Sequence, residues 1–151
     1  MIPPFETSPG EDGHYQLPPG IHQATWSEMA ERFGANERRK AILAGLLRAL
    51  RALKAAGCRR VFVDGSFVTS KEMPGDFDGC WDPADVDFDT LEPVLLDFAG
   101  HREAQKAMFE GELFIAVTPA DALGTRFLEF FQLDRDGRSK GIVQLDLKDI
   151  P

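Results

Sequence analysis

The sequence has few cysteines, no long apolar run and no recognisable targeting segment. Two cysteines, Cys58 and Cys80, occur in 151 residues, which is too few for a disulfide framework or a cysteine-based zinc site and favours a reducing cytoplasm. No apolar run approaches the roughly 18 residues that a membrane span needs. Residues 1–6 have neither a basic region nor an apolar core, so we expect no secretory signal. These absences predict a cytoplasmic protein with no membrane partner.

Basic residues are also scarce. Lys and Arg number 17 against 25 Asp and Glu, which gives a net charge of −8. This acidic balance argues against broad, sequence-independent DNA binding, although it leaves room for a local basic face. The chain is 43% hydrophobic and 28% charged, so it can bury a core and does not resemble a disordered protein. Its length fits a single domain with a tail.

Proline and glycine divide the chain into two parts. Turn-forming residues recur every few positions through residues 1–20, most clearly at residues 17–20 (LPPG), and no apolar period accompanies them. We expect residues 1–20 to form an extended arm that either drapes over the domain or docks on a partner. Residues 21–151 are expected to form one folded domain.

Two helices are expected before the first buried strand. Thr25 and Glu28 have the spacing of a capping box, which predicts a short helix that ends near residue 33. Asn36 is a second N-cap, and leucines at helical spacing predict a helix to about residue 56, with Leu46 and Leu50 on its buried stripe. The opposite face is basic, and we interpret it as a solvated surface in preference to a phosphate or RNA surface. Its basic residues are Arg38, Arg39, Lys40, Arg48, Arg51 and Lys54.

The rest of the domain alternates strands and helices. Strands are expected over residues 60–64, 76–81, 113–117 and 142–147. Helices are expected over residues 91–98 and 102–109, and a further helix after Thr118 would carry Leu123 and Phe127 on its core face. Helices and strands thus interleave around a small mixed sheet, which places the fold in the α/β or α+β class.

The feature that indicates chemistry is Gly65-Ser66 followed by Asp76 and Asp78. Gly65-Ser66 comes directly after the strand at residues 60–64, and a helix starting there would present free backbone N–H groups and a hydroxyl to a phosphate. Gly65 allows a triphosphate to approach the backbone closely. Asp76 and Asp78 are two positions apart on an expected strand, so their carboxylates share one face and could bind divalent metal.

A strand, Gly-Ser, a short loop and Asp-x-Asp together resemble the active-site signature of the nucleotidyltransferase superfamily, which includes DNA polymerase β and the minimal bacterial nucleotidyltransferases. Residues 65–71 (GSFVTSK), 74–78 (PGDFD) and 131–143 (FQLDRDGRSKGIV) are similar to a group of small bacterial nucleotidyltransferase-like proteins. The resemblance spans residues 20–147. It implies metal-dependent transfer of a nucleoside monophosphate from a nucleoside triphosphate to a protein or RNA acceptor, with Mg²⁺ or Mn²⁺ as the cofactor.

The resemblance also implies roles for individual residues. Asp76 and Asp78 would hold the metal ions. Such enzymes usually draw a third carboxylate from a neighbouring strand, and Glu112 is the candidate for this metal ligand or general base. Gly65 and Ser66 would hold the β- and γ-phosphates. The lysines that could reach the phosphates are Lys71 and Lys140.

Each of these features also has a purely structural interpretation. Gly65-Ser66 could be an ordinary turn with a serine cap, and Asp76 and Asp78 could be solvated residues of a loop and an edge strand. Lys71 could be an ordinary solvated lysine of a loop, because most exposed lysines do not contact a ligand. The alternative function is a catalytically inactive nucleotidyltransferase fold that acts as a binding module, such as an antitoxin or a defence-system subunit. A third carboxylate that points away, or an ion-paired Asp76, would favour this alternative.

Overall fold

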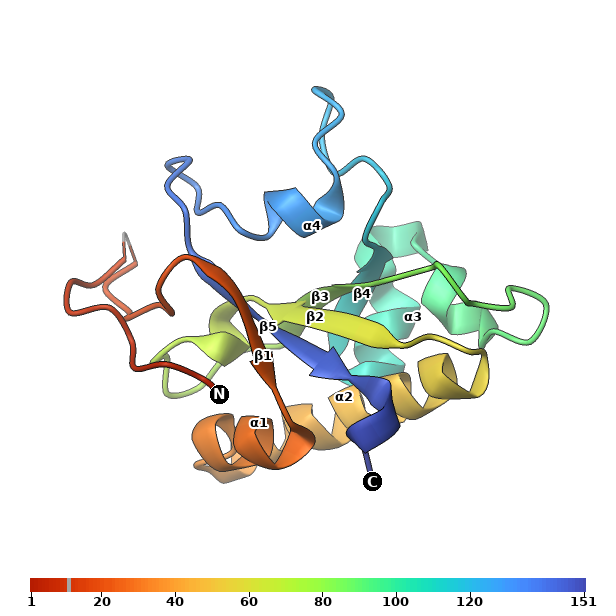
Figure 1. Ribbon diagram of the computed structural model, residues 1–151, viewed down its shortest axis with the longest axis horizontal. Helices are drawn as coiled ribbons and strands as arrows, with labels where there is room; N and C mark the ends of the chain where they lie inside the picture. Colours follow the sequence, from red (N-terminus) through yellow and green to blue (C-terminus); the bar gives the residue numbers. More distant parts are fainter. Residues whose placement is uncertain (11) are drawn as a thin grey trace.

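The computed structural model describes residues 1–10 and 12–151, and these contain a five-stranded mixed sheet with strand order β1-β5-β2-β3-β4 (Figure 1). The strands are β1 (Gly20–Ala24), β2 (Arg60–Asp64), β3 (Phe77–Trp81), β4 (Gly111–Ile115) and β5 (Gly141–Asp146). The α-helices are α1 (Trp26–Phe33), α2 (Glu37–Ala55), α3 (Ala99–Phe109) and α4 (Phe127–Phe130). Short 3₁₀ turns cover Ser66–Val68, Pro93–Leu96 and Leu147–Asp149. The expected α+β class is confirmed.

Local sequence signals fix where α1 and α2 begin and end. The Thr25 hydroxyl accepts a hydrogen bond from the Glu28 N–H at 3.1 Å, and the Glu28 carboxylate accepts one from the Thr25 N–H at 3.3 Å, so the expected capping box is present. The Asn36 side chain accepts a hydrogen bond from the Arg39 N–H at 2.8 Å and opens α2. Gly57 follows α2 with a φ of +97°, a conformation that glycine adopts readily.

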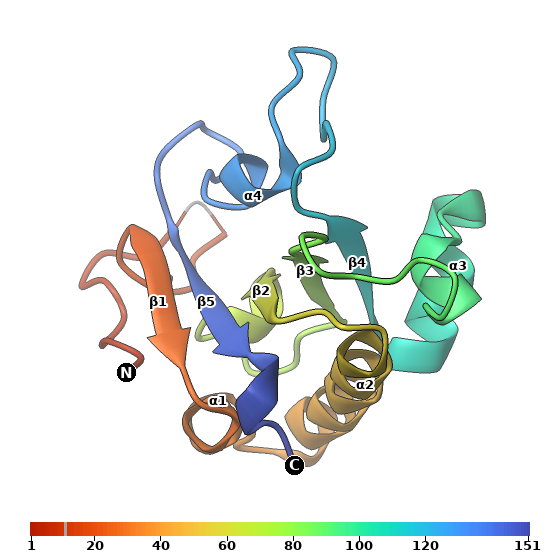
Figure 2. The ribbon, with the colours of Figure 1, turned by 45° about the vertical axis from the view of Figure 1, so that its right-hand side comes forward.

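The two faces of the sheet carry different hydrophobic clusters. Along β2, Val61 and Val63 belong to the main core, together with the fully buried Leu46 and Leu50 of α2. Phe62 alternates to the opposite face. A second, smaller cluster on that face consists of Phe62, Cys80, Ala116, Phe131 and Ile142. Figure 2 shows α1 and α2 on one side of the sheet and α4 on the other.

The N-terminal segment lies against the domain and leads into β1 (Figure 1). Leu17 is buried in the main core, and its carbonyl accepts a hydrogen bond from the first residue of β5 at 3.0 Å. Tyr15 and Ser70 exchange two hydrogen bonds, of 2.7 and 3.0 Å, which join the segment to the loop between β2 and β3. Residue 11, within the expected arm, lies outside the described residues.

Two of the expected helices are wrong. The segment expected to be helical over residues 91–98 contains a 3₁₀ turn of four residues, because Pro93 has no N–H and disfavours the α conformation at Glu92. The helix expected to carry Leu123 is confined to α4. Gly124, with a φ of +81°, turns the chain there, and Leu123 is 92% exposed.

Strand boundaries differ from the expectation in smaller ways. β1 is not among the expected strands, because its short sequence has a weak pattern and its partner β5 lies at the other end of the chain. β3 begins at Phe77, so Asp76 lies just before it, and β4 covers residues 111–115 where 113–117 was expected. Among the described residues, no helix has the length and apolar character needed to cross a membrane.

Candidate functional site

Three carboxylates stand side by side on the sheet face that carries α4. Asp64 on β2 is the register partner of Asp78 on β3, and Asp78 is the register partner of Glu112 on β4. Side chains at partner positions on neighbouring strands project from the same face and lie close together. Each belongs to the side of its strand that also contributes to the second hydrophobic cluster. We call Asp64, Asp78 and Glu112 the acidic row.

Asp64 is a member of this site that the sequence analysis missed. It is 5% exposed, and its carboxylate forms an ion pair with Lys140, which precedes β5. Burial raises the pKa of Asp64, while the attraction of Lys140 acts in the opposite direction. Lys140, considered from the sequence as a phosphate contact, is therefore engaged inside the protein. The only sequence signal for Asp64 is its place at the end of β2, on the same side of the strand as Phe62.

Gly65 brings the backbone against Asp78. Its φ is +88°, and a Cβ atom at this position would lie 2.8 Å from Asp78 Oδ2 and 3.1 Å from the Asp78 nitrogen. Glycine is thus needed both for its conformation and for the close approach of the Asp78 carboxylate.

The helix expected to begin at Ser66 is wrong. The chain forms a 3₁₀ turn of three residues, Ser66–Val68, and becomes extended at Thr69, whose hydroxyl and N–H both donate to the Ser66 carbonyl. A turn of this length aligns too few peptide groups to provide the positive helix terminus on which the expected phosphate cradle depends.

Two arginines of α2 hold the loop that separates Gly65-Ser66 from Asp76. Arg39 is 5% exposed and donates to the carbonyls of Phe67 at 2.7 Å and Thr69 at 2.8 Å. It also donates to the carbonyls of Phe33 and Lys71. Arg38 donates to the Pro74 carbonyl at 3.1 Å. The interpretation of this basic helix face as solvated is wrong for Arg39, which precedes the buried stripe by one helical turn.

Asp76 and Asp78 lie on either side of the fully buried Phe77 and are both partly buried. Burial raises the pKa of Asp78 to about 8, and repulsion from Asp76, Glu112 and Asp64 adds to the rise. Burial and Glu112 also raise the pKa of Asp76. Three nearby cations, including the candidate residue Lys71, partly offset that rise. Within the described part of the chain, neither aspartate takes part in an ion pair.

Glu112 is held by two cations of α3. Arg102 Nε lies 2.8 Å from Glu112 Oε2, and Lys106 Nζ lies 3.7 Å from the same oxygen. The Glu112 side chain is only 14% exposed. Both ends of the acidic row are therefore neutralised by lysine or arginine, whereas its centre, Asp78 with the adjacent Asp76, is not.

The donor set at the centre of the row suits a hard divalent cation. Mg²⁺ and Mn²⁺ bind carboxylate oxygens, and Asp76 and Asp78 supply two that lack a cationic partner. Among the described residues, however, no group of three or more His, Cys, Asp or Glu side chains is arranged to hold a metal ion. The side chains of Asp78 and Glu112 nevertheless interact directly, while Glu112 Oε2 contacts Arg102 and Lys106.

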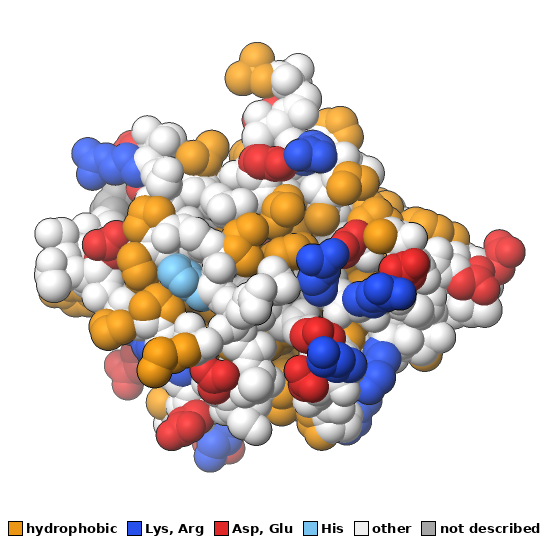
Figure 3. Space-filling view, viewed as in Figure 1, with side chains coloured by type: hydrophobic (Ala, Val, Ile, Leu, Met, Phe, Trp, Pro, Cys, Tyr) orange, Lys and Arg blue, Asp and Glu red, His pale blue; other side chains and the backbone are white. Residues whose placement is uncertain are grey.

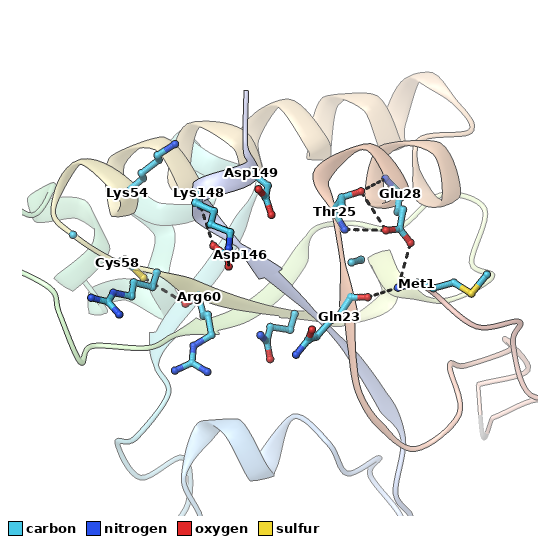
Figure 4. A pocket seen from close by; sticks show the side chains of 14 residues that line it. Met1, Gln23, Thr25, Glu28, Lys54, Cys58, Arg60, Asp146, Lys148 and Asp149 are labelled. Atoms are coloured by element: carbon cyan, nitrogen blue, oxygen red, sulfur yellow. Dashed lines mark hydrogen bonds and ion pairs between the residues drawn. The ribbon is translucent and has the colours of Figure 1, made fainter.

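The visible surface of the molecule is mixed in character. Figure 3 shows hydrophobic side chains around α4 and, elsewhere on the side that faces the viewer, Lys and Arg interspersed with Asp and Glu. A cavity of about 900 Å³ lies near the start of β2 and the ends of β1 and β5 (Figure 4). Its lining includes Thr25, Glu28, Arg60 and Lys148 but no member of the acidic row. The carboxylates therefore lie outside this cavity.

The fold and site define a small α+β domain with an acidic row across three neighbouring strands. Residues 9–146 match a family of unknown function designated DUF6932, and the chain belongs to this family. Searches of curated proteins and of solved structures gave no match.

Proposed function

We propose that this protein is a metal-dependent nucleotidyltransferase that moves a nucleoside monophosphate from a nucleoside triphosphate to a protein or RNA acceptor. The observation that carries the proposal is the pair Asp76 and Asp78, which is partly buried, takes part in no ion pair among the described residues and lies beside the close approach of Gly65. Such a pair needs a proton or a cation, and a metal triphosphate supplies the cation together with the substrate.

Different residues of the site would bind different parts of the metal–nucleotide complex. Asp76 and Asp78 would hold the divalent cation, which when bound increases the acidity of the acceptor hydroxyl and neutralises the leaving pyrophosphate. Gly65 and Ser66 would contact the triphosphate through the serine hydroxyl and individual backbone N–H groups, without the helix terminus that the sequence led us to expect. Lys71, whose charge acts on Asp76, would add a further phosphate contact.

In the reaction, the acceptor oxygen forms a bond to the α-phosphorus while the bond from that phosphorus to the bridging oxygen of pyrophosphate breaks. The acceptor proton must go to a base. Glu112 is the candidate, since it lies beside Asp78 in the register of β3 and β4. The Glu112 carboxylate can accept the proton only when Arg102 and Lys106 no longer neutralise it.

The test is transfer of label from an α-³²P-labelled nucleoside triphosphate. The purified protein is incubated with Mg²⁺ or Mn²⁺, each of the four ribonucleotides, and either total RNA or a protein extract as the acceptor. We expect label in one acceptor fraction with wild type, and none with Asp78→Asn or with EDTA. Asp89→Asn, an equivalent substitution at an exposed position, is the matched control and should retain transfer.

A second candidate function is a binding module with an inactive site, such as an antitoxin or a defence-system subunit. The observation that favours it is the engagement of Glu112 by Arg102 and Lys106, which leaves the third carboxylate neutralised. Absence of transfer, together with absence of metal-dependent nucleotide binding, would favour this function over the enzyme.

A further inference from the structure

The segment that leads into α3 has an unusual backbone. Gly100, His101 and Arg102 have φ values of +56°, +58° and +61°, and all three adopt the left-handed helical conformation. Two of the three are not glycine. For residues with a Cβ atom this conformation costs free energy, and it persists where other contacts compensate.

Contacts with β4 hold both ends of this segment. The Phe98 ring stacks on the Phe114 ring, with centroids 5.8 Å apart and planes 6° apart. The Arg102 guanidinium lies 5.6 Å from the centre of the same ring, while its Nε bonds to Glu112. Glu112 and Phe114 are two residues apart and share one face of the strand. The strained segment is therefore tied to the strand that carries the end of the acidic row.

We propose that Arg102 exchanges partners at this site: it neutralises Glu112 in the free protein and binds a phosphate group of the nucleotide when metal and nucleotide enter. The proposal rests on the proposed function. A divalent cation held by Asp76 and Asp78 would lie next to Glu112, the register partner of Asp78, and would then compete with Arg102 for the Glu112 carboxylate. The planar guanidinium fits phosphate as well as carboxylate, so the arginine released from Glu112 finds an equivalent partner in the triphosphate.

Arg102 is better suited to this exchange than the other cations of the row. Its side chain is 29% exposed and belongs to the strained turn. The Lys140 side chain is 15% exposed and the side chain of its partner Asp64 only 7%, so separating that pair would leave a deeply buried charge. Lys106 lies farther from Glu112 and comes from the regular part of α3.

The test compares two affinities, measured by calorimetry, for wild type and Arg102→Gln. Because Arg102→Gln removes the competitor for Glu112, it should tighten the binding of Mn²⁺ alone by about fivefold. This factor corresponds to the free energy of a partly exposed ion pair. Removing the phosphate partner should weaken the binding of the Mg²⁺ complex of ATP by about tenfold. GTP, CTP and UTP are measured in parallel. Lys106→Gln, which removes a charge near the same carboxylate oxygen, is the matched control and should not weaken nucleotide binding.

The two affinities must change in opposite directions. If Arg102→Gln weakens both, Arg102 only maintains the structure, and if it leaves nucleotide binding unchanged or tighter, Arg102 only blocks Glu112. Either result overturns the exchange. Glu112→Gln provides a second variant. It frees Arg102, so ATP without metal should bind to this variant more tightly than to wild type. Unchanged binding of ATP would also overturn the proposed exchange. A wild type that binds neither Mn²⁺ nor Mg²⁺–ATP would instead reject the proposed function itself.

Discussion

Asp78 Oδ2 lies 2.8 Å from the point where a Cβ atom on Gly65 would stand. The two residues therefore act as a pair, since the carboxylate occupies space that only glycine leaves free. The contact joins the end of β2 to the acidic row and sets the distance between the backbone and the centre of the proposed metal site.

Gly65→Ala should disturb both stability and ligand binding. The substitution adds a clash with Asp78 and places alanine at a φ of +88°, so we expect a loss of about 2 kcal/mol in the free energy of unfolding. Gly75→Ala is the control, because nothing lies within 4 Å of its added Cβ. Urea denaturation of both variants checks the prediction, and equal midpoints would contradict it.

Arg39→Met should loosen the loop between β2 and β3. The change leaves the carbonyls of Phe67 and Thr69 without their buried donor, and we expect unfolding to become about 3 kcal/mol easier. Arg51→Met is the comparison, since Arg51 is exposed and donates a single bond to the terminal Pro151 carbonyl. Chemical denaturation should separate the two variants clearly, whereas a similar small loss in both would show that Arg39 does not anchor the loop.

Leu50→Ala should test the packing of α2 on the sheet. Leu50 is fully buried, and truncation of a core leucine costs about 2–5 kcal/mol. Leu96→Ala, at a position 39% exposed, should cost much less. A thermal melt of each variant measures the difference, and an unchanged melting temperature for Leu50→Ala would contradict its place in the core.

Stability without metal should fall as pH rises from 5 to 9. The pKa of Asp78 is raised to about 8 in the folded protein, so between its unfolded value and 8 the folded state binds more protons than the unfolded state. The free energy of unfolding then decreases with pH, by up to about 1.4 kcal/mol per pH unit for one proton. Asp78→Asn removes this proton, so its unfolding free energy should decrease less steeply in EDTA buffer. Parallel pH profiles for the two proteins would contradict the raised pKa.

Signals that act within a few residues made much of the fold predictable. The Thr25–Glu28 capping box and the Asn36 N-cap set the starts of α1 and α2, and the buried run at residues 60–64 set β2. Leu123 shows where such reasoning fails. Its spacing fits a helical core face, but the turn at Gly124 places it in solvent.

The site depends more on contacts between distant segments, and these could not be predicted. Asp64 joins the acidic row only because β2 pairs with β3 in one register. From the sequence alone, Arg39 cannot be distinguished from the exposed arginines of α2. It is buried because it donates to carbonyls of a loop some 30 residues later. The engagement of Glu112 by Arg102 depends on a left-handed turn that the residue types do not indicate.

The most direct measurement of the proposed function is thermal unfolding with Mg²⁺ and a nucleoside triphosphate, together and separately. A ligand selective for the folded state at a hundredfold excess over its dissociation constant stabilises it by about 2.7 kcal/mol. We predict a large upward shift of the melting temperature for wild type with both components and a much smaller shift with either alone. Asp78→Asn should remain folded and lose the combined shift, while Asp89→Asn should keep it. A wild type that melts at the same temperature with and without Mg²⁺ and each of the four triphosphates would contradict a metal-nucleotide site at Asp76 and Asp78.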